Sequence, residues 1–345
     1  MMKVMNLAGI KQMEMQEKAF PMIKNGKDVL IKMSVVAVCG SDIHYYTDGK
    51  IGSKIVTYPF PVGHECSGIV EKTGDEVKKI KPGDRIAIEP AMSCGHCDQC
   101  LSGRPHTCRS LKFLGCPGQA DGSMSEYIVM PESCCFPIPD HVSMDEAALS
   151  EPLSIGLYAV KRSIPMLNAK VGILGYGPIG MSVMLAAQSK GAKDFYVTDK
   201  INERLAIALK EGAHIASNIT QEESINKILK KEPLGLDVVF ECCGQQEALE
   251  DAIALLKPGG TVMIIGIPSF DKWQITADLA RSKEITFINV RRQNHCVQEA
   301  LDLIASKKID LSRMPTHYFS FAESKQAFDL VHNYEDGVMK AIIRF

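Results

Sequence analysis

The chain has 345 residues, of which 46% are hydrophobic and 23% charged, with a formal net charge of −2. A chain of this length is most often two domains and can bury a substantial core. The near-neutral charge argues against a protein that binds nucleic acid or an anionic membrane surface through a basic patch. No apolar run reaches the roughly 18–20 residues that span a bilayer. The N-terminus lacks the apolar run of a signal peptide, so we expect a cytoplasmic protein with a small-molecule partner.

The first stretch, to about residue 155, is rich in glycine, proline and short β-type runs. Strands are expected over 29–33, 68–71 and 86–88, and the last of them follows a turn at 81–85. Many short strands separated by turns are typical of a compact all-β or barrel-like domain.

From about residue 156 the pattern changes to strands that alternate with helices, which predicts an α/β domain with a parallel sheet. The expected strands are 171–174, 195–198, 238–240 and 261–265, and the expected helices are 178–189 and 202–210. From about residue 290 a helix and strand segments return, ending in a strand at 340–344. No internal repeat or low-complexity tract is present.

A glycine fingerprint lies between the strand at 171–174 and the helix that follows it. It reads Gly-x-Gly-x-x-Gly and comprises Gly175, Gly177, Pro178, Ile179 and Gly180. The first glycine allows a tight turn, the second lets a pyrophosphate approach the backbone, and the third lets the helix pack on the strand. The helix N-terminus then offers unpaired N–H groups to the pyrophosphate. The motif predicts a dinucleotide site.

Asp199 ends the next expected strand, where a carboxylate accepts hydrogen bonds from the adenosine ribose and repels a 2′-phosphate. The chain is therefore expected to use NAD rather than NADP. The alternative interpretation is that Asp199 only caps the helix beginning near Asn202. Lys200 and Arg204 are candidate cofactor contacts, and the simpler interpretation makes them a solvated helix start.

Four cysteines gather in one short stretch with the spacing Cys-x2-Cys-x2-Cys-x7-Cys, namely Cys94, Cys97, Cys100 and Cys108. Four thiolates this close can form a tetrahedral shell around Zn²⁺. An iron–sulfur run would continue with x3-Cys-Pro, whereas here the fourth cysteine follows x7 and precedes Arg109. A zinc ribbon for nucleic acid conflicts with the neutral charge. A closed shell has no open position, so this zinc is expected to be structural.

A second, catalytic metal is suggested by polar residues in three other segments. Cys39 and His44 lie in one segment, His64 and Glu65 in another, and Glu151 in a third. Three protein ligands with an open fourth position make zinc a Lewis acid. Taken singly, a histidine is usually a hydrogen-bonded core residue and Glu65 could be a solvated charge, but the combined spacing favours a metal site.

Together these motifs resemble the zinc-dependent medium-chain alcohol dehydrogenase family, and the resemblance covers essentially the whole chain. The segments that carry it are 39–42, 63–68, 81–86, the four-cysteine stretch, 175–180 and 257–260. Within the family, the segments 39–46, 49–52 and 151–154 are similar to the sorbitol (polyol) dehydrogenase branch.

The resemblance implies a GroES-like catalytic domain, residues 1–155 and 290–345, split around a Rossmann NAD-binding domain, residues 156–289. It implies two zinc ions per chain and a homo-oligomer, a tetramer or a dimer. Cys39, His64 and Glu65 would bind the catalytic zinc, and Glu151 would coordinate it directly or hold its water. Ser41 would start a proton relay through the nicotinamide ribose to His44.

The implied activity is oxidation of a secondary alcohol of a polyol, of the sorbitol or xylitol type, to a ketose with hydride transfer to NAD⁺. Tyr45 and Arg292 are the candidate substrate residues. Polyol dehydrogenases place an aromatic residue after an arginine here, whereas this chain has Arg291-Arg292 followed by Gln293. The alternatives are an L-threonine-type amino alcohol, a sugar acid such as L-idonate, or a sugar phosphate such as galactitol 1-phosphate. A regulatory protein that binds NAD and zinc is the non-enzyme alternative.

Overall fold

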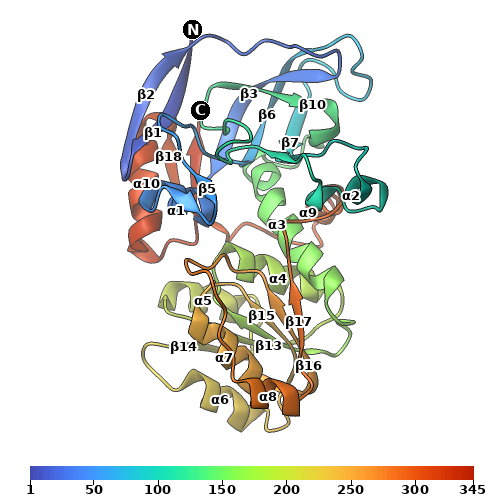
Figure 1. Ribbon diagram of the computed structural model, residues 1–345, viewed down its shortest axis with the longest axis vertical. Coiled ribbons are helices and arrows are strands. Elements are labelled where there is room, and N and C mark those ends of the chain that lie inside the picture. The colour runs from blue at the N-terminus through green and yellow to red at the C-terminus, as the bar shows by residue number, and fades with distance from the viewer. The chain divides into compact units, whose positions relative to one another are not determined.

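The computed structural model describes residues Met1–Phe345 and divides them into two compact units (Figure 1). The first unit contains Met1–Glu151 together with Val297–Phe345, and the second contains Pro152–Cys296. The sequence placed the junctions after residues 155 and 289. The helix α3 (Met144–Arg162) runs through the first junction, so no change in secondary structure marks it.

A seven-stranded sheet forms the framework of the first unit, with the strand order β11-β7-β6-β3-β19-β18 and β10 paired to β3. The sheet takes its members from both ends of the chain, because the C-terminal strand β19 pairs antiparallel with β3. The strands are β3 (Asp28–Ala37), β6 (Glu65–Thr73), β7 (Arg85–Ile88), β10 (Tyr127–Pro131), β11 (Cys135–Pro137), β18 (Pro315–Ser320) and β19 (Lys340–Arg344).

Smaller elements complete this unit. The two-stranded sheets pair β1 (Met2–Gly9) with β2 (Gln12–Lys18), β4 (Lys50–Ile51) with β5 (Lys54–Ile55), and β8 (Ala91–Met92) with β9 (Lys112–Phe113). Its other α-helices are α1 (Gly40–Thr47), α2 (Asp98–Leu101), α9 (Val297–Ala305) and α10 (Ser324–Asn333), and its 3₁₀ helices are η1 (Pro105–Thr107), η2 (Glu132–Cys134), η3 (Phe321–Glu323) and η4 (Glu335–Gly337). The unit is therefore β-rich, as predicted, but α1 and α10 pack into its core through Tyr46 and Phe328.

The second unit is built on a six-stranded parallel sheet in the order β14-β13-β12-β15-β16-β17. The chain starts in the middle at β12 and winds outward in both directions, which is the doubly wound Rossmann arrangement. The strands are β12 (Lys170–Leu174), β13 (Asp194–Asp199), β14 (Ile215–Asn218), β15 (Leu236–Glu241), β16 (Leu256–Ile264) and β17 (Thr286–Asn289); the helices are α4 (Pro178–Ser189), α5 (Asn202–Lys210), α6 (Ser224–Lys231), α7 (Gln246–Leu255) and α8 (Ala277–Ser282). The predicted parallel sheet is confirmed.

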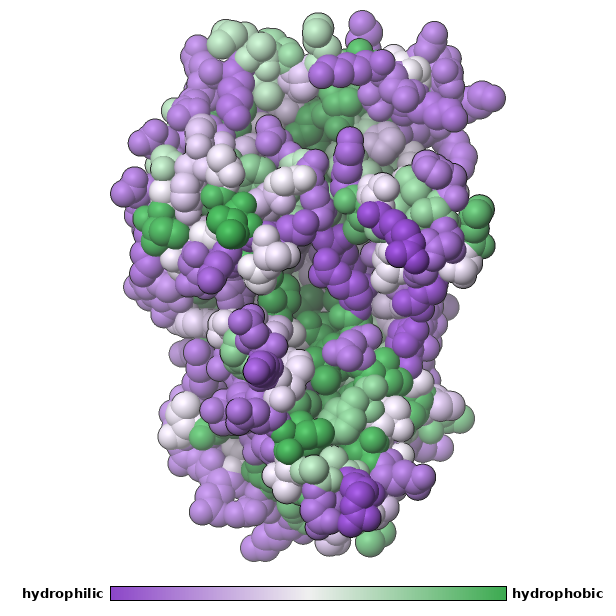
Figure 2. Space-filling model, in the orientation of Figure 1, coloured by the Kyte–Doolittle hydropathy of each residue, from purple (hydrophilic) through white to green (hydrophobic).

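The surface is mostly hydrophilic on the face drawn in Figure 2, with hydrophobic side chains gathered in separate patches. The exposed apolar residues include Leu101 on the four-cysteine stretch and Leu167, Leu209 and Leu234 on the second unit. No helix combines the length and the apolar character that crossing a bilayer requires.

Candidate metal centres and cofactor site

The four cysteines predicted to bind a structural metal converge in space. Their sulfurs lie within 4.8 Å of one another. The Sγ–Sγ distances are 3.6 Å for Cys97 and Cys100, 3.9 Å for Cys97 and Cys108, and 4.0 Å for Cys94 and Cys100. Zinc–sulfur bonds of about 2.3 Å at tetrahedral angles require about 3.8 Å between sulfurs. The donor set and its spacing therefore fit a closed Zn²⁺ site.

Backbone N–H groups lower the pKa of the Cys94 and Cys97 thiols and so favour the thiolate form that a metal requires, whereas burial and the neighbouring cysteines raise the pKa of Cys100 to about 11. Hydrogen bonds from the N–H groups of Arg109 and Cys100 lower the pKa of Cys97 to about 6. The N–H group of Cys94 donates to Cys108 Sγ at 3.3 Å. The Arg109 side chain pairs with Asp98, at 2.5 and 2.8 Å, so its charge is shared with a carboxylate on α2. Hydrogen bonds and an ion pair within residues 94–109 therefore hold this stretch around the four sulfurs.

A second cluster is formed by Cys39, His64 and Glu65, whose ligand atoms also lie within 4.8 Å of one another. Cys39 immediately precedes α1 in an extended conformation, and the N-terminus of a helix stabilises a thiolate. His64 and Glu65 enter β6 after Gly63, which has a φ of +96°. A Cβ on Gly63 would also lie 2.9 Å from Ser123 Oγ. One thiolate, one imidazole and one carboxylate are a donor set suited to a catalytic Zn²⁺.

Asp42 on α1 connects two members of this cluster. Its Oδ2 accepts a hydrogen bond from the N–H group of Cys39 at 3.3 Å, and its Oδ1 accepts one from Gly63 N–H at 3.2 Å. Oδ1 also lies 3.4 Å from His64 Nδ1. Burial alone would lower the pKa of His64, but Asp42 and Cys39 raise it well above its ordinary value. His64 Nδ1 makes no hydrogen bond of good geometry, so Asp42 acts on this side of the ring through its charge.

Lys340 on β19 holds the third member of the cluster. Its Nζ donates to Glu65 Oε1 at 2.9 Å, to Glu65 Oε2 at 2.7 Å and to the carbonyl of Val38 at 3.1 Å. The Lys340 and Glu65 side chains are 2% and 1% exposed, so water does not screen this ion pair. Burial alone would lower the pKa of the Lys340 ammonium, but Glu65 and Cys39 raise it above its ordinary value.

The other residues predicted to act at the catalytic metal lie around this cluster at greater distance or with other partners. Glu151 is buried on α3 and is not one of the three residues whose ligand atoms converge. Ser41 Oγ donates to Cys39 Sγ at 3.3 Å. His44 Nδ1 lies 3.2 Å from Asp48 Oδ2, and the His44 side chain is 31% exposed. Ser41 thus faces the cluster, while His44 is open to solvent.

The two predicted substrate residues belong to different units. Tyr45 is buried in the core of the first unit, and its hydroxyl lies 3.7 Å from Cys116 Sγ. Arg292 belongs to the second unit, is partly buried, and has a left-handed backbone with a φ of +55°. Seven other residues besides the glycines share a positive φ, so this backbone conformation alone does not mark Arg292 as a substrate residue.

The glycine fingerprint forms the turn between β12 and α4 that its spacing predicts. A Cβ on Gly180 would lie 2.1 Å from the carbonyl oxygen of Gly175, so helix and turn touch through backbone atoms. Gly175 has a φ of +91°, and a Cβ there would lie 2.8 Å from Cys243 Cβ. Gly177 precedes α4, which begins with Pro178. This backbone cradle fits the pyrophosphate of a dinucleotide at the helix N-terminus.

Asp199 braces this turn instead of capping α5. Its Oδ2 accepts a hydrogen bond from Tyr176 N–H at 2.6 Å, and its Oδ1 accepts from Lys200 N–H and Ile201 N–H at 2.7 and 2.9 Å. The helix-cap interpretation is therefore wrong, because α5 begins after Ile201 without a side-chain cap.

Arg204 also departs from its simpler interpretation. It is 8% exposed, not solvated, and its Nη1 lies 3.4 Å from where a Cβ on Gly177 would be. Lys200 is exposed, as expected of a helix start. The buried guanidinium beside the fingerprint is positioned to face an anionic group at the turn.

Three residues that support these sites were missed as functional residues by sequence reasoning. Asp42 was read only as part of a motif, and Lys340 only as part of a strand, although a lysine inside the apolar run 338–343 is an anomaly that signals a buried partner. Glu241 ends β15 fully buried, and its Oε1 accepts from Cys243 N–H and Gly244 N–H at 2.7 and 2.5 Å. It shapes the loop that contacts Gly175.

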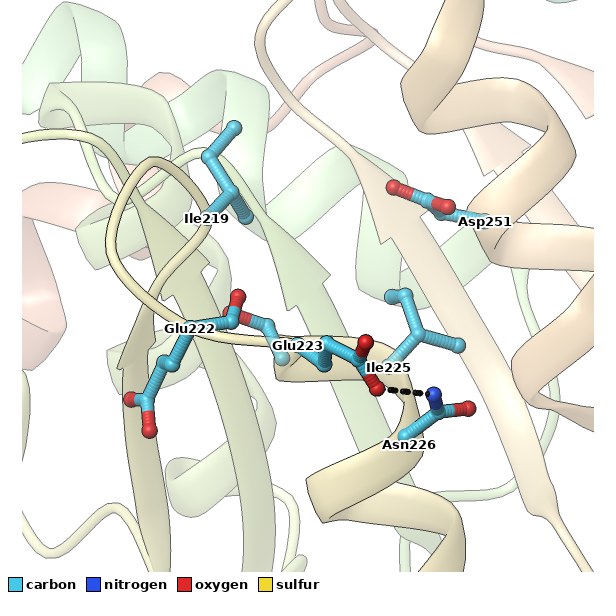
Figure 3. A pocket seen from close by; sticks show the side chains of 7 residues that line it. Ile219, Glu222, Glu223, Ile225, Asn226 and Asp251 are labelled. Atoms are coloured by element: carbon cyan, nitrogen blue, oxygen red, sulfur yellow. Dashed lines mark hydrogen bonds between the residues drawn. The ribbon is translucent and has the colours of Figure 1, made fainter.

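A pocket of about 330 Å³ on the second unit lies apart from this chemistry (Figure 3). Its lining includes Glu222, Glu223 and Asp251. Asn226 Nδ2 donates to Glu223 Oε2 at 2.6 Å, and Glu222 pairs with Lys227 at 3.0 Å. Neither glutamate is left without a local partner, and none of these residues belongs to the fingerprint or to either metal cluster.

Comparison with known proteins places both units in described families. Residues 25–140 match the alcohol dehydrogenase GroES-like domain, and residues 178–306 match the zinc-binding dehydrogenase family. Sorbitol dehydrogenase of Bacillus subtilis (strain 168) is 34% identical over 92% of this chain and 90% of its own length. L-Idonate 5-dehydrogenase of Vitis vinifera is 35% identical over 94% of this chain and 89% of its own length.

Solved structures with bound nicotinamide cofactors have the same fold. A zinc-binding dehydrogenase of Sinorhizobium meliloti 1021 bound to NADP is 30% identical, with a TM-score of 0.90 over 100% of this chain and 99% of that one. An alcohol dehydrogenase of Escherichia coli CFT073 complexed with NADH is 27% identical, with a TM-score of 0.91 over the same shares of the two chains. The predicted GroES-like and Rossmann fold is thereby confirmed.

Proposed function

Since this chain belongs to the zinc-dependent medium-chain alcohol dehydrogenase family, as a zinc- and NAD-dependent polyol dehydrogenase, we propose that it oxidises a secondary hydroxyl of a sorbitol- or xylitol-type polyol to a ketose. The observation that carries the proposal is the convergence of Cys39, His64 and Glu65 within 4.8 Å. Zinc bound there supplies a Lewis acid with an open position for the substrate oxygen, and bound NAD⁺ supplies the hydride acceptor.

The protein residues at the first unit hold and orient that metal. Cys39 Sγ, His64 Nε2 and a Glu65 oxygen are the proposed ligands, with Asp42 beside the histidine ring and Lys340 holding the carboxylate. Glu151, which is buried on α3, is the proposed outer ligand that holds the coordinated water. Cys94, Cys97, Cys100 and Cys108 are proposed to bind the second zinc, which stabilises the surface stretch around them.

Ser41 and His44 are the proposed route for the proton that the substrate hydroxyl loses. Ser41 Oγ faces the cluster, as its hydrogen bond to Cys39 Sγ indicates. Ser41 Oγ would take up the proton of the substrate hydroxyl, and bound NAD⁺ would supply the ribose hydroxyls that complete a relay of this proton to His44. His44 can release it to water because its side chain is 31% exposed and its Nδ1 is held by Asp48.

The residues proposed to hold the cofactor lie on the second unit. Gly175, Gly177, Pro178, Ile179 and Gly180 form the pyrophosphate turn, and Arg204 adds a buried positive charge beside it. Oδ2 of Asp199 accepts one backbone hydrogen bond, from Tyr176, so a lone pair is left to accept a ribose hydroxyl. Its negative charge favours NAD over NADP.

A sugar acid is the second candidate substrate, favoured by the adjacent Arg291 and Arg292. Guanidinium groups bind carboxylates through paired hydrogen bonds, and the relative from Vitis vinifera bears the name L-idonate 5-dehydrogenase. Tyr45 is buried and its hydroxyl points toward Cys116. Its proposed role is therefore to line the substrate site by packing, not to form a hydrogen bond with the substrate.

We also propose a homo-oligomer in the cytoplasm. Strand β17 is the last in the sheet of the second unit and pairs only with β16, so its outer edge offers unpaired backbone groups to a second copy. Sedimentation measurements distinguish a monomer from the dimer or tetramer expected here.

The proposal is tested by NADH formation with a panel of sorbitol, xylitol, galactitol, L-idonate, galactitol 1-phosphate and L-threonine. The highest kcat/KM is expected for sorbitol or xylitol, and highest turnover of L-idonate would favour the second candidate. Activity should disappear when a chelator removes one metal ion per chain and return when Zn²⁺ is added. Turnover that survives loss of the metal at Cys39 would overturn the proposal.

A further inference from the structure

The ion pair between Lys340 and Glu65 is the one buried contact of a proposed metal ligand with a basic side chain. Both oxygens of the Glu65 carboxylate accept hydrogen bonds from Lys340 Nζ, at 2.9 and 2.7 Å. The same Nζ donates a third hydrogen bond to the carbonyl of Val38 at 3.1 Å. All three donors of Lys340 are therefore used. Any metal that binds Glu65 must therefore share its carboxylate with the Lys340 ammonium.

Charge makes this arrangement more than a local hydrogen bond. The buried ionisable side chains around the cluster are Asp42, His64, Glu65, Glu151 and Lys340, and Lys340 is the only lysine or arginine among the buried residues of the first unit. A buried cation next to a carboxylate that also binds Zn²⁺ repels the metal and withdraws electron density from the ligand. Between side chains this deeply buried, such charges interact several times more strongly than at the surface.

We infer that Lys340 is a positioning residue that keeps Glu65 a shared, weakly donating ligand, so that the zinc keeps its Lewis acidity and its open position. The inference rests on the proposed function, because it takes Cys39, His64 and Glu65 as the catalytic zinc ligands. Without the metal, Lys340 balances the Glu65 charge and stabilises the empty cluster. With the metal, the same carboxylate is divided between Lys340 and zinc.

The strand that carries Lys340 makes this role possible. Lys340 begins β19, which pairs with β3 through Ile342 and Ala37, while Glu65 begins β6, which pairs with β3 through the same Ala37. Two flanking strands of one sheet thus bring residues 65 and 340 to the same end of β3. The ammonium is restrained beside the carboxylate because it is buried and also donates to the Val38 carbonyl at 3.1 Å.

The test replaces Lys340 and measures metal binding separately from turnover. After the catalytic zinc is removed by dialysis against a chelator, Co²⁺ is titrated into wild type and into Lys340→Met, Lys340→Gln and Lys340→Arg variants, and its binding is read from the Cys39–cobalt charge-transfer absorption. Thermal stability is recorded for each variant with and without the metal.

Removal of the charge is expected to tighten Co²⁺ binding by roughly tenfold or more, because a repulsive charge near the metal is lost. Lys340→Met should also melt at lower temperature than wild type without the metal, since Glu65 is then buried without a partner, and metal should restore most of the difference. Lys340→Gln, which keeps a hydrogen-bond donor, should show the same tightening with a smaller loss of stability. Lys340→Arg should behave like wild type.

A purely structural role predicts something different. Lys340→Met would then be destabilised equally with and without metal, and its Co²⁺ affinity would be unchanged or weaker; either result overturns the inference. In a Glu65→Gln background, Lys340→Met should no longer tighten Co²⁺ binding, because the coupling requires the carboxylate. If the wild-type protein itself gives no cysteine–cobalt absorption at this site, the proposed function fails instead.

Discussion

Asp42 Oδ1 lies 3.4 Å from His64 Nδ1, and the other oxygen of the same carboxylate accepts the backbone N–H of Cys39. One buried carboxylate thus binds the backbone of one proposed zinc ligand and lies beside the ring of another. Outer partners of this kind raise the basicity of the ligand.

Replacing Asp42 with asparagine should weaken metal binding at Cys39, His64 and Glu65 without loss of the fold. Loss of such an outer carboxylate typically costs about 10–100-fold in metal affinity. Chelator competition on the purified variant measures the change. Asp48→Asn is the matched control, because Asp48 contacts His44 at the exposed end of α1 and not a ligand. Equal metal affinities in the two variants would contradict the role given to Asp42.

Replacing Cys97 with serine should remove the structural metal alone. The sulfur of Cys97 lies 3.6 and 3.9 Å from two other sulfurs of the cluster, and three thiolates no longer close the shell around Zn²⁺. Metal analysis should fall from two ions per chain to one, with a lower melting temperature. Cys243→Ser, at an exposed cysteine outside both clusters, should keep both ions. A variant with Cys97 replaced that retains two would argue against the assignment.

A methyl group at Gly180 should disrupt the dinucleotide turn. An added Cβ would lie 2.1 Å from the Gly175 carbonyl oxygen, and overpacking of this kind costs about 1–3 kcal/mol, occasionally more. Gly180→Ala should therefore lower both the melting temperature and the affinity for NADH measured by fluorescence. Gly40→Ala serves as the control, since a Cβ there meets no atom within 4 Å. Equal stability of the two variants would show that the turn yields easily.

Replacing Asp199 with asparagine should weaken NADH binding and relax the preference against NADPH. The change removes the charge that repels a 2′-phosphate and leaves one of three backbone N–H donors poorly satisfied. We expect NADH to bind about tenfold more weakly, with the NADPH-to-NADH affinity ratio increased. Glu203→Gln, an exposed position in the first turn of α5, should leave the ratio unchanged. An unaltered NADPH-to-NADH affinity ratio in Asp199→Asn would contradict the claim that the Asp199 charge disfavours NADPH.

The parallel sheet could be predicted because four of its strands and two of its helices have a clear local pattern and the fingerprint lies between the first strand and the first helix. The edge strands β14 and β17 and the helices α6, α7 and α8 were not predicted. The expected helices 178–189 and 202–210 match α4 and α5 residue for residue. The sheet of the first unit could not be predicted in this way. Its strand β19 pairs with β3 about 300 positions away, and no local pattern encodes so distant a partner.

The same limit applies to the candidate sites. The spacing of Cys94, Cys97, Cys100 and Cys108 predicted that the four sulfurs converge, because these residues are close in sequence. The hydrogen bonds of Asp199 to Tyr176 and of Lys340 to Glu65 join residues from separate strands. The position of Glu151 on α3 could not be predicted, because Pro152 follows it inside that helix and proline usually ends a helix.

The central claim is that hydride leaves a secondary carbon of a polyol for NAD⁺ while a metal is held by Cys39, His64 and Glu65. The most direct measurement incubates the enzyme with NAD⁺ and sorbitol deuterated at C2, and follows the cofactor by mass spectrometry. The account predicts deuterium in the reduced nicotinamide with wild type, and none with Cys39→Ser that still binds NADH. Deuterium transfer by that variant, or none by the zinc-loaded wild type with any deuterated polyol, would contradict it.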